Sequence, residues 1–266
     1  GLFRVIQFTQ DDAHIFCTEQ QVEDEIVKII ELDEFFYKKF GFGFRVELST
    51  RPEKRIGDDK TWDKAEKVLE NVLKKKKMNF KLNKGEGAFY GPKIDFHLKD
   101  SLGREWQCAT IQLDFSMPER FDLEYTDKDN KKKQPIMIHR TVYGSLERFM
   151  SVLIEHYNGR FPTWLAPIQV RILSFTDRNQ KAAEKIIKEL GDTIPKIRID
   201  ADFRQIPVQS KVKDAEIMRV PYILVIGDKE EKDKTLAVRV KGSGKIQTYK
   251  IEEFISRIKR EIEERL

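Results

Sequence analysis

Asp12 and His14 lie two residues apart near the start of the chain. In an extended segment, side chains two residues apart point to the same face, so this carboxylate and imidazole would lie side by side. Such a pair could bind a metal ion or hydrogen-bond a polar ligand. A single histidine is more often structural, so the pair alone does not decide its role. Cys17 has the opposite strand parity to His14, which favours packing.

Two glutamines and a lysine follow further along the chain. Lys93 comes directly after a glycine-rich segment, residues 85–92, which by itself is usually only a turn, although it could let the backbone approach a ligand. Gln107 and Gln112 are five apart, so an unbroken strand would point them to opposite faces. Either a bulge intervenes or one of them lies beyond the end of the strand.

Arg148 stands in a predicted amphipathic helix. Its planar guanidinium could donate two parallel hydrogen bonds to a phosphate group. Taken without its context, a surface ion pair with Glu147 or Glu155 is the simpler interpretation.

These side chains need a sheet and helices to position them. Residue patterns predict strands at 1–8, 13–17, 44–48, 80–82, 93–98, 104–113 and 135–139, and helices at 18–40, 61–73 and 144–157. Thr18 and Gln21 form a capping box at the start of the first helix. Residues 100–103 are a predicted hairpin turn, and residues 127–133 a polar loop. The pattern indicates an antiparallel α+β unit.

Residues 158–167 contain two prolines and mark the predicted boundary between domains. Beyond it, strands are predicted at 168–175, 196–200, 222–226 and 236–240, alternating with helices at 178–190, 208–219 and 251–266. Alternation of this kind predicts a largely parallel α/β sandwich. The predicted domains are 1–160 and 161–266.

The composition is that of a soluble globular protein. Hydrophobic residues make up 39% and charged residues 36% of 266, with no apolar run near the ~18 residues of a membrane span. Two cysteines cannot form a disulfide framework, and no signal peptide is recognisable, which favours a reducing cytoplasm. The net charge of +5 is compatible with a polyanionic partner without requiring one. Because the chain opens without Met and already in a strand pattern, we expect a fragment.

Several segments together resemble one family. Residues 1–17 resemble the second half of motif 2 in the class II aminoacyl-tRNA synthetases that charge Thr, Pro, Ser, Gly and His, and residues 8–14 are similar to the threonyl-tRNA synthetases specifically. Further similarities follow in the family's order, at residues 85–93, 106–108, 112–115, 137–140, 144–148 (motif 3), 162–167 and 221–230. The resemblance spans essentially the whole chain. A prolyl or glycyl relative is disfavoured because paired histidines suit a zinc-dependent threonine pocket.

The resemblance implies an N-terminally truncated, antiparallel-sheet α+β catalytic domain followed by a three-layer α/β anticodon-binding domain. Motif 1, the start of motif 2, the editing domain and one zinc-ligand cysteine are absent from this sequence. The implied activity is threonine–tRNA ligation by the parent protein, and whether this chain alone is active stays open. The alternative is a catalytically inactive, synthetase-like module that binds tRNA or a regulatory partner.

Activation of threonine requires its carboxylate to attack the α-phosphorus of ATP. Because that carboxylate is already ionised at pH 7, the protein's task is positioning and charge neutralisation. The resemblance implies catalytic roles for Arg4, Lys93 and Arg148. It assigns ATP to Arg4, Phe8, Gln107, Ser145 and Arg148, with Mg²⁺ accompanying ATP, and it assigns threonine to Gln10, Asp12, Tyr90 and Gln112.

The resemblance also implies one zinc ion, held by His14 and His139 with a third ligand, a cysteine, expected upstream of this chain. Zinc would bind the substrate's amino and hydroxyl groups, and Asp12 would accept a hydrogen bond from the hydroxyl. Cys108, His97 and His156 are expected to be structural.

The implied partners are tRNA(Thr), ATP and threonine, with a homodimeric parent protein, a cytoplasmic location and no membrane contact. Glu230 and Arg239 align with anticodon-contacting positions, although an exposed glutamate and a strand arginine are otherwise ordinary surface residues. The lysine runs at 74–77 and 131–133 are interpreted as solvated charge.

Overall fold

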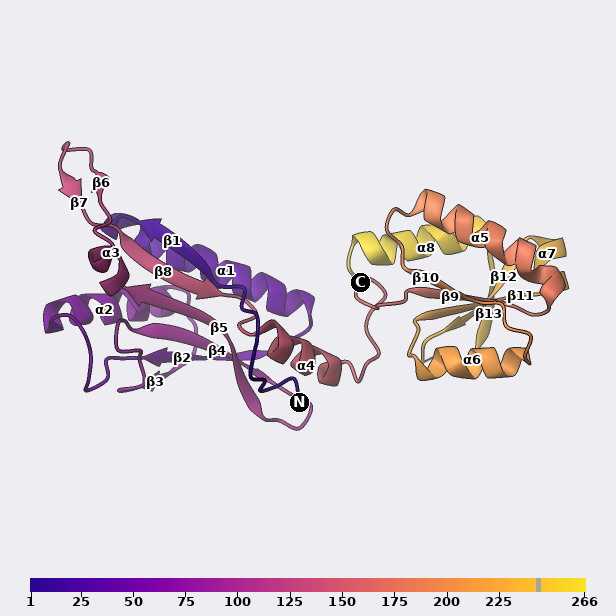
Figure 1. Cartoon of the computed structure of the whole chain (residues 1–266), viewed down its shortest axis with the longest axis horizontal. Coiled ribbons are helices and arrows are strands. Elements are labelled where there is room, and N and C mark those ends of the chain that lie inside the picture. Colours follow the sequence, from indigo (N-terminus) through magenta and orange to yellow (C-terminus); the bar gives the residue numbers. More distant parts are fainter. Residues whose placement is uncertain (243–244) are drawn as a thin grey trace. The chain divides into compact units, whose positions relative to one another are not determined.

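The structure is a computed structural model that describes residues 1–242 and 245–266. It divides into two compact units, Gly1–His156 and Tyr157–Leu266 (Figure 1). The sequence analysis expected the division at residue 160. Each unit has its own sheet and its own covering helices, and each is described here by itself.

The first unit is built on a six-stranded sheet with the order β1-β8-β5-β4-β2-β3. Its strands are β1 (Ala13–Cys17), β2 (Phe44–Ser49), β3 (Phe80–Asn83), β4 (Lys93–Lys99), β5 (Glu105–Asp114) and β8 (Ile136–Thr141). Every pairing is antiparallel except β2 with β3, which is parallel. The predicted antiparallel α+β class is confirmed, and the glycine-rich segment between β3 and β4 has to pass β2 because those two strands are not neighbours.

The described helices of this unit are η1 (Glu19–Gln21), α1 (Val22–Lys39), α2 (Asp59–Lys75), α3 (Ser116–Arg120) and α4 (Leu146–His156). Helices α1 and α2 cover one face of the sheet (Figure 1). The predicted capping box is present, since the Thr18 backbone N–H donates to Gln21 Oε1 at 2.9 Å. Helices α1 and α2 pack together behind the sheet (Figure 1) and bury Ile26, Ile30, Trp62 and Leu69. The opposite face of the sheet carries polar side chains, among them Lys93, Gln107 and Gln112.

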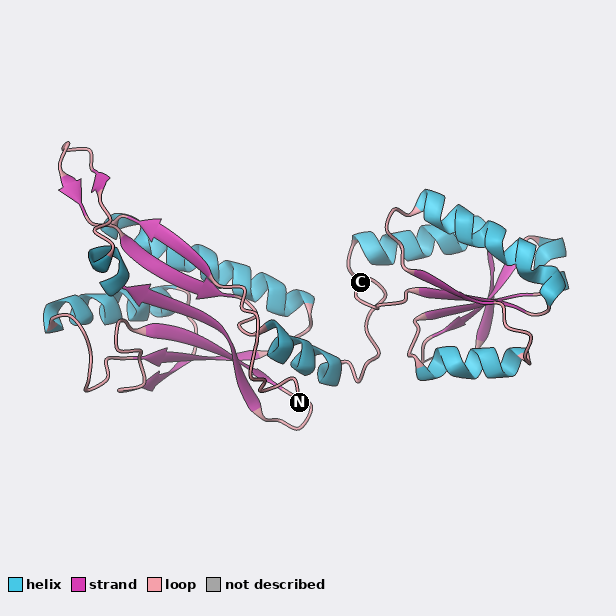
Figure 2. Cartoon of the chain, viewed as in Figure 1, coloured by secondary structure: helices cyan, strands magenta, loops and turns pink. Residues whose placement is uncertain are grey.

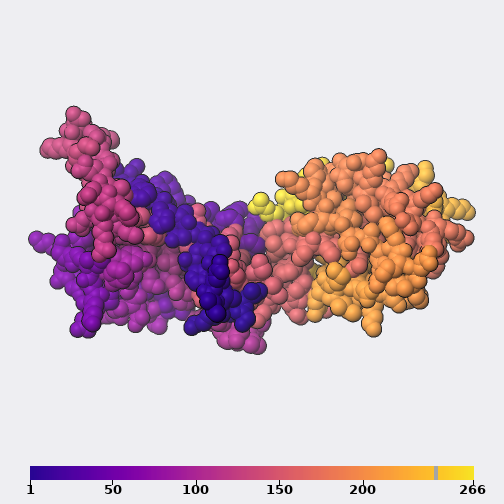
Figure 3. Space-filling view, viewed as in Figure 1, coloured from indigo at the N-terminus to yellow at the C-terminus, as the bar shows by residue number. Residues whose placement is uncertain are grey.

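Two local predictions were wrong. Residues 1–8 are a loop rather than a strand (Figure 2), because a strand needs a ladder partner and the isolated Gln10–Ser145 bridge is the only pairing among described residues before Ala13. The loop lies over the surface of the first unit (Figure 3). Residues 127–133, predicted as a loop, end in β7 (Lys132–Lys133), which pairs with β6 (Tyr125–Thr126).

The second unit contains a five-stranded sheet with the order β10-β9-β11-β12-β13. Its strands are β9 (Val170–Ser174), β10 (Ile199–Asp202), β11 (Tyr222–Ile226), β12 (Thr235–Val240) and β13 (Ile246–Lys250). The pairings among β10, β9 and β11 are parallel, whereas β11, β12 and β13 pair antiparallel. The prediction of a largely parallel sheet was therefore half right, and it missed β13.

Helices cover both faces of this second sheet, which confirms the predicted three-layer fold. They are η2 (Asp177–Asn179), α5 (Gln180–Thr193), α6 (Val208–Ile217), α7 (Asp228–Asp233) and α8 (Ile251–Glu263), and α7 was not predicted. Helices α5 and α8 share one face and α6 covers the other (Figure 1). Leu190 and Phe254 belong to the core of the first face, and Ala215 to that of the second. Among the described residues, no helix is both long enough and apolar enough to cross a membrane.

Candidate functional site

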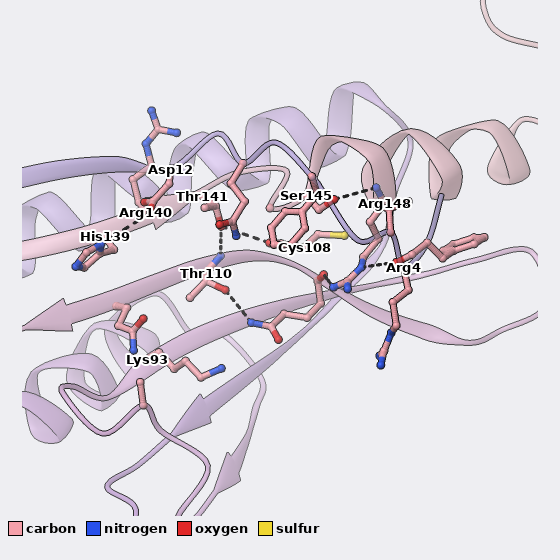
Figure 4. A pocket seen from close by; sticks show the side chains of 18 of the residues that line it. Arg4, Asp12, Lys93, Cys108, Thr110, His139, Arg140, Thr141, Ser145 and Arg148 are labelled. Carbon is pink, nitrogen blue, oxygen red and sulfur yellow. Dashed lines mark hydrogen bonds and ion pairs between the residues drawn. The ribbon is translucent and has the colours of Figure 1, made fainter. Parts of the chain in front are cut away.

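A cavity of about 440 Å³ lies over the polar face of the six-stranded sheet. Side chains alternate between faces along a strand, so Ile94 and Ile111 are buried towards the helices while Lys93 and Gln112 line the cavity. All site residues predicted for the first unit line it except His14: Arg4, Phe8, Gln10, Asp12, Tyr90, Lys93, Gln107, Gln112, His139, Ser145 and Arg148. Figure 4 shows Asp12 and His139 at one end and Arg4 and Arg148 at the other.

The end of the cavity at Asp12 and His139, called the imidazole end, brings together three side chains that could hold a metal ion. His14 of β1 and His139 of β8 are directly opposite in the antiparallel ladder, and their ring centroids are 4.5 Å apart. Asp12 Oδ2 lies 3.9 Å from His139 Nδ1 and 4.0 Å from His14 Nε2. One ligand atom from each of the three side chains lies within 4.8 Å of the others. Two imidazoles and a carboxylate are donors that zinc accepts, so these residues fit such an ion.

A buried carboxylate fixes the ring of His139. Asp114 Oδ2 lies 2.9 Å from His139 Nε2, and the Asp114 side chain is only 2% exposed. A proton on Nε2 would donate to this carboxylate and would leave the Nδ1 lone pair facing Asp12, the arrangement found around metal-binding histidines. Asp114 lies in a segment, residues 112–115, that resembles the family, but the sequence alone indicated no role for it.

A bulge in β5 explains how both glutamines reach the cavity. Asp95 of β4 pairs with Thr110 of β5, whereas His97, two residues on, pairs with Gln107, three residues back. The extra residue in β5 reverses the alternation of side chains between the two faces. Gln107 and Gln112 therefore both line the cavity, as the bulge alternative predicted.

Asp95 organises the middle of the cavity. Its carboxylate accepts hydrogen bonds from Gln107 Nε2 at 2.6 Å and Thr110 Oγ1 at 2.9 Å, and it pairs with Lys93 Nζ at 2.7 Å. Such charge-assisted contacts hold three side chains of the pocket in place. Asp95 was not among the predicted site residues, although its position two residues after Lys93 places both on one strand face.

Tyr90 enters the cavity from the glycine-rich segment. Its hydroxyl donates to Gln112 Oε1 at 3.0 Å. Burial, together with the nearby Asp114 and Asp12 charges, raises the pKa of Tyr90, so the hydroxyl stays a donor at neutral pH.

The glycines of that segment serve the fold. A Cβ on Gly91 would stand 1.6 Å from the Leu113 carbonyl oxygen, and one on Gly87 would stand 2.6 Å from the Thr50 carbonyl oxygen. At these two positions the backbone thus packs directly on neighbouring backbone, which agrees with the interpretation of the segment as a turn.

Arg148 forms backbone contacts at the other end of the cavity. Its Nε donates to the Phe3 carbonyl at 3.1 Å and its Nη1 to the Gln107 carbonyl at 3.0 Å. Its guanidinium lies 5.6 Å from the centre of the Trp106 ring, within cation–π range. Glu147 instead accepts hydrogen bonds from the Thr9 backbone N–H, so the surface ion pair is not the arrangement found.

Trp106 is itself anchored. Its indole N–H donates to Asp100 Oδ2 at 2.9 Å, and its ring stacks on Phe3 with centroids 4.5 Å apart. Burial opposes ionisation of Asp100, but the hydrogen bonds from Trp106 and Arg104 lower its pKa to about 2. The sequence analysis gave none of these supporting residues a role.

The remaining cysteines and histidines have structural surroundings. Cys17 and Cys108 are buried, and burial raises the pKa of Cys108 to about 12. His97 Nε2 lies 3.2 Å from Glu47 Oε2, and burial lowers the pKa of His97. His156 packs against the Phe42 ring at 4.5 Å.

In the second unit, Glu230 and Arg239 line separate cavities of about 760 and 360 Å³. Glu230 Oε2 accepts the Gly227 N–H at 3.0 Å, which caps helix α7. Arg239 donates to Glu216 Oε1 at 3.0 Å. The structure does not bring the two together.

Comparison with known proteins gives consistent matches for both units. The family model "tRNA synthetase class II core domain (G, H, P, S and T)" matches residues 1–157, and "Anticodon binding domain" matches residues 169–261. Curated relatives include threonine–tRNA ligases of Clostridium kluyveri, 50% identical over all of this chain and 41% of the relative, and of Acetivibrio thermocellus, 52% identical over 97% of this chain and 40% of the relative. The chain thus spans about two fifths of these relatives.

Solved structures agree. The RNA binding domain of threonyl-tRNA synthetase from Cryptosporidium parvum Iowa II superposes with a TM-score of 0.91 at 38% identity, over 97% of this chain and 65% of that one. A putative threonyl-tRNA synthetase, ThrRS-1, from Aeropyrum pernix gives a TM-score of 0.80 at 30% identity, over 99% of this chain and 64% of that one.

Proposed function

This chain belongs to the class II tRNA synthetase core family, and we propose that it is the catalytic and anticodon-binding part of a threonine–tRNA ligase. The proposal is carried by one observation: the Asp12, His14 and His139 cluster stands at one end of a cavity whose other end holds Arg4 and Arg148. The curated relatives at about 50% identity support it.

The first step would join threonine to AMP. The threonine carboxylate oxygen attacks the α-phosphorus of ATP, a new C–O–P linkage forms, and the bond to pyrophosphate breaks. We propose that Arg4 and Arg148 neutralise charge on the phosphates and that Lys93 contacts the reacting phosphate and carboxylate. Mg²⁺ would accompany ATP, as in other class II synthetases. Phe8 would stack on adenine, with Gln107 and Ser145 completing the nucleotide site.

The amino acid would occupy the imidazole end. Gln10, Tyr90 and Gln112 would contact threonine, and Asp12 would accept the hydrogen bond of its hydroxyl. His14 and His139 would hold zinc, and the third ligand, one cysteine, is expected upstream of this chain. Zinc, when bound, would supply coordination positions not filled by the protein, to which the amino and hydroxyl groups of threonine could bind together.

The second step transfers threonine to the 3′ end of tRNA(Thr). We propose that the second unit reads the anticodon, with Glu230 and Arg239 contacting different nucleotides because they line different cavities. We further propose that the intact protein is a cytoplasmic homodimer. These assignments rest on the family resemblance.

Pyrophosphate exchange in the intact protein tests the proposal. The expected result is ATP–pyrophosphate exchange that depends on threonine, together with about one bound zinc per chain. A protein that binds tRNA(Thr) yet catalyses no exchange with threonine would instead support the alternative, an inactive tRNA-binding or regulatory module.

A further inference from the structure

Asp11 faces away from the cavity and holds the turn that leads into helix α4. Its Oδ2 accepts the Val142 N–H at 2.9 Å, and its Oδ1 accepts the N–H groups of Tyr143 at 3.1 Å and Gly144 at 3.0 Å. Oδ2 also lies 3.6 Å from Arg140 Nη1. One carboxylate therefore binds three consecutive backbone donors between β8 and α4.

Helix α1 holds the same turn through a second contact. Tyr37 of α1 is fully buried, and its hydroxyl donates to the Val142 carbonyl at 2.8 Å while accepting the Ala109 N–H at 3.0 Å. Gly144 has φ 67°, and a Cβ there would stand 2.3 Å from the Cys108 carbonyl oxygen. The turn is thus packed on the β5 bulge and cannot move independently of it.

The first turn of α4 follows directly and carries two residues of the proposed nucleotide site. The Arg148 N–H donates to Ser145 Oγ at 3.3 Å, and the Leu146 N–H donates to the Thr9 carbonyl at 2.9 Å. Glu147 closes the arrangement, since it accepts the Thr9 N–H at 3.1 Å and the Ser145 hydroxyl at 3.0 Å. The position of Arg148 therefore depends on the turn that precedes Ser145.

We propose that Asp11 is a positioning residue for the nucleotide end of the cavity. By binding the 142–144 amides it fixes the start of α4, and so sets where Ser145 and Arg148 meet the phosphates. This inference rests on the proposed function. Asp12, its neighbour in sequence, lines the cavity at the amino-acid end, so the two adjacent acids would serve different substrates.

Asp11→Asn is a sharp test because both oxygens of Asp11 accept backbone N–H groups. In either orientation the new amide NH₂ faces a backbone donor, so at least one of the three amides loses its acceptor. The side-chain size is unchanged. Asp192→Asn, at an exposed position of the second unit, removes the same charge and serves as the control.

The experiment compares Michaelis constants in the intact protein by threonine-dependent exchange. We expect Asp11→Asn to raise the KM for ATP about tenfold and to lower kcat, with the KM for threonine changed less than about twofold. Asp12→Asn should show the reverse pattern. If Asp11→Asn changed the KM values for ATP and threonine equally, or changed neither, Asp11 would have only a general structural role and the proposal would be overturned.

Two further measurements keep the outcome decisive. Tyr37→Phe loosens the same turn by removing its hydrogen bond to the Val142 carbonyl. It should reproduce the ATP-selective defect at smaller size, and if Asp11→Asn does not fold, this variant decides. ATP affinity is also measured by calorimetry without threonine. A wild-type protein that binds ATP but lacks exchange would refute the proposed function, while a weaker ATP affinity in Asp11→Asn would still support this inference.

Discussion

The two ends of the cavity differ in how far their side chains are already engaged. At the imidazole end, His14 and Asp12 have side chains 46% and 36% exposed, and their ligand atoms face one another at about 4 Å. At the arginine end, Arg148 donates to two backbone carbonyls and lies over an indole ring. The imidazole end therefore has exposed side-chain atoms that a ligand can contact. At the arginine end, Arg148 is already held by hydrogen bonds to the protein backbone.

Under the proposed function, this difference indicates which end of the cavity should determine amino-acid selectivity and which should determine the reaction rate. An end with available ligand atoms can discriminate between amino acids by which of their polar groups it satisfies. An end whose arginine is fixed before the substrate arrives suits transition-state stabilisation, since preorganised charge needs no rearrangement during the reaction. Changes at the two ends should therefore affect different kinetic constants.

Asp33, which is buried in helix α1 and does not line the cavity, should affect the stability of the fold and neither end of the cavity directly. Asp33 of α1 is fully buried, and neither of its carboxylate oxygens has a hydrogen-bond partner among the described residues. Burial raises its pKa to about 8, against the opposing effect of Arg140. Because the folded state keeps this proton while the unfolded state loses it above about pH 4, stability should fall between pH 4 and pH 8 by up to about 1.4 kcal/mol per pH unit.

Asp33→Asn cannot ionise, so it should remove this contribution to the pH dependence. The expected result is a variant more stable than the wild type at pH 8, by about 5 kcal/mol at most, and similar to it at pH 4. Thermal unfolding across this pH range measures the difference. A wild-type protein and variant with parallel profiles would show that Asp33 is not a buried proton carrier.

Arg148→Ala should lower the rate of adenylate formation about 100-fold, the usual cost of deleting one preorganised transition-state contact. Affinity for tRNA should stay largely intact because the change is confined to the arginine end. Arg148→Lys is the matched control: it keeps the charge but loses the planar fork, so an intermediate rate is expected. An unchanged exchange rate in Arg148→Ala would show that Arg148 does not contribute to adenylate formation.

Asp114→Asn should act at the imidazole end alone. Loss of the charged acceptor on His139 Nε2 should weaken zinc affinity about tenfold, at the low end for residues that orient a ligand. Chelator competition measures this without reference to activity. Asp95→Asn is the control, since Asp95 is about equally buried in the same sheet but contacts Lys93 and Gln107 instead. Equal losses of zinc in both variants would contradict the assignment.

Periodicity was sufficient for the framework of the fold but not for its pairing. The strand at 93–98 and the helix at 61–73 have strong local patterns, and both are present as β4 and α2. The 1–8 strand failed because alternation cannot show whether a ladder partner exists. The order of strands in the sheet could not be predicted either, since the placement of β2 between β3 and β4 depends on contacts distant in sequence.

The site residues also fall into a group that the sequence could suggest and a group that it could not. Residues that line the cavity stand in recognisable segments, so the resemblance could suggest them. The residues that hold them in place, such as Asp95, Asp11 and Tyr37, act through backbone groups and neighbours on other strands. Their roles follow from three-dimensional contacts that spacing along the chain does not encode.

Competition among three amino acids tests the central claim most directly. In the intact protein, kcat/KM is measured for threonine, serine and valine by pyrophosphate exchange, in the wild type and in Asp12→Ala. The account predicts that valine is disfavoured about 10⁴-fold because it leaves Asp12 and the metal unsatisfied, while serine, which lacks only a methyl group, is disfavoured about 10- to 200-fold. Asp12→Ala should weaken threonine and serine together, narrow the margin over valine and leave ATP binding unaffected. A wild-type protein that activated valine as readily as serine would contradict the hydroxyl-recognising pocket and the assignments of Asp12, His14 and His139 with it.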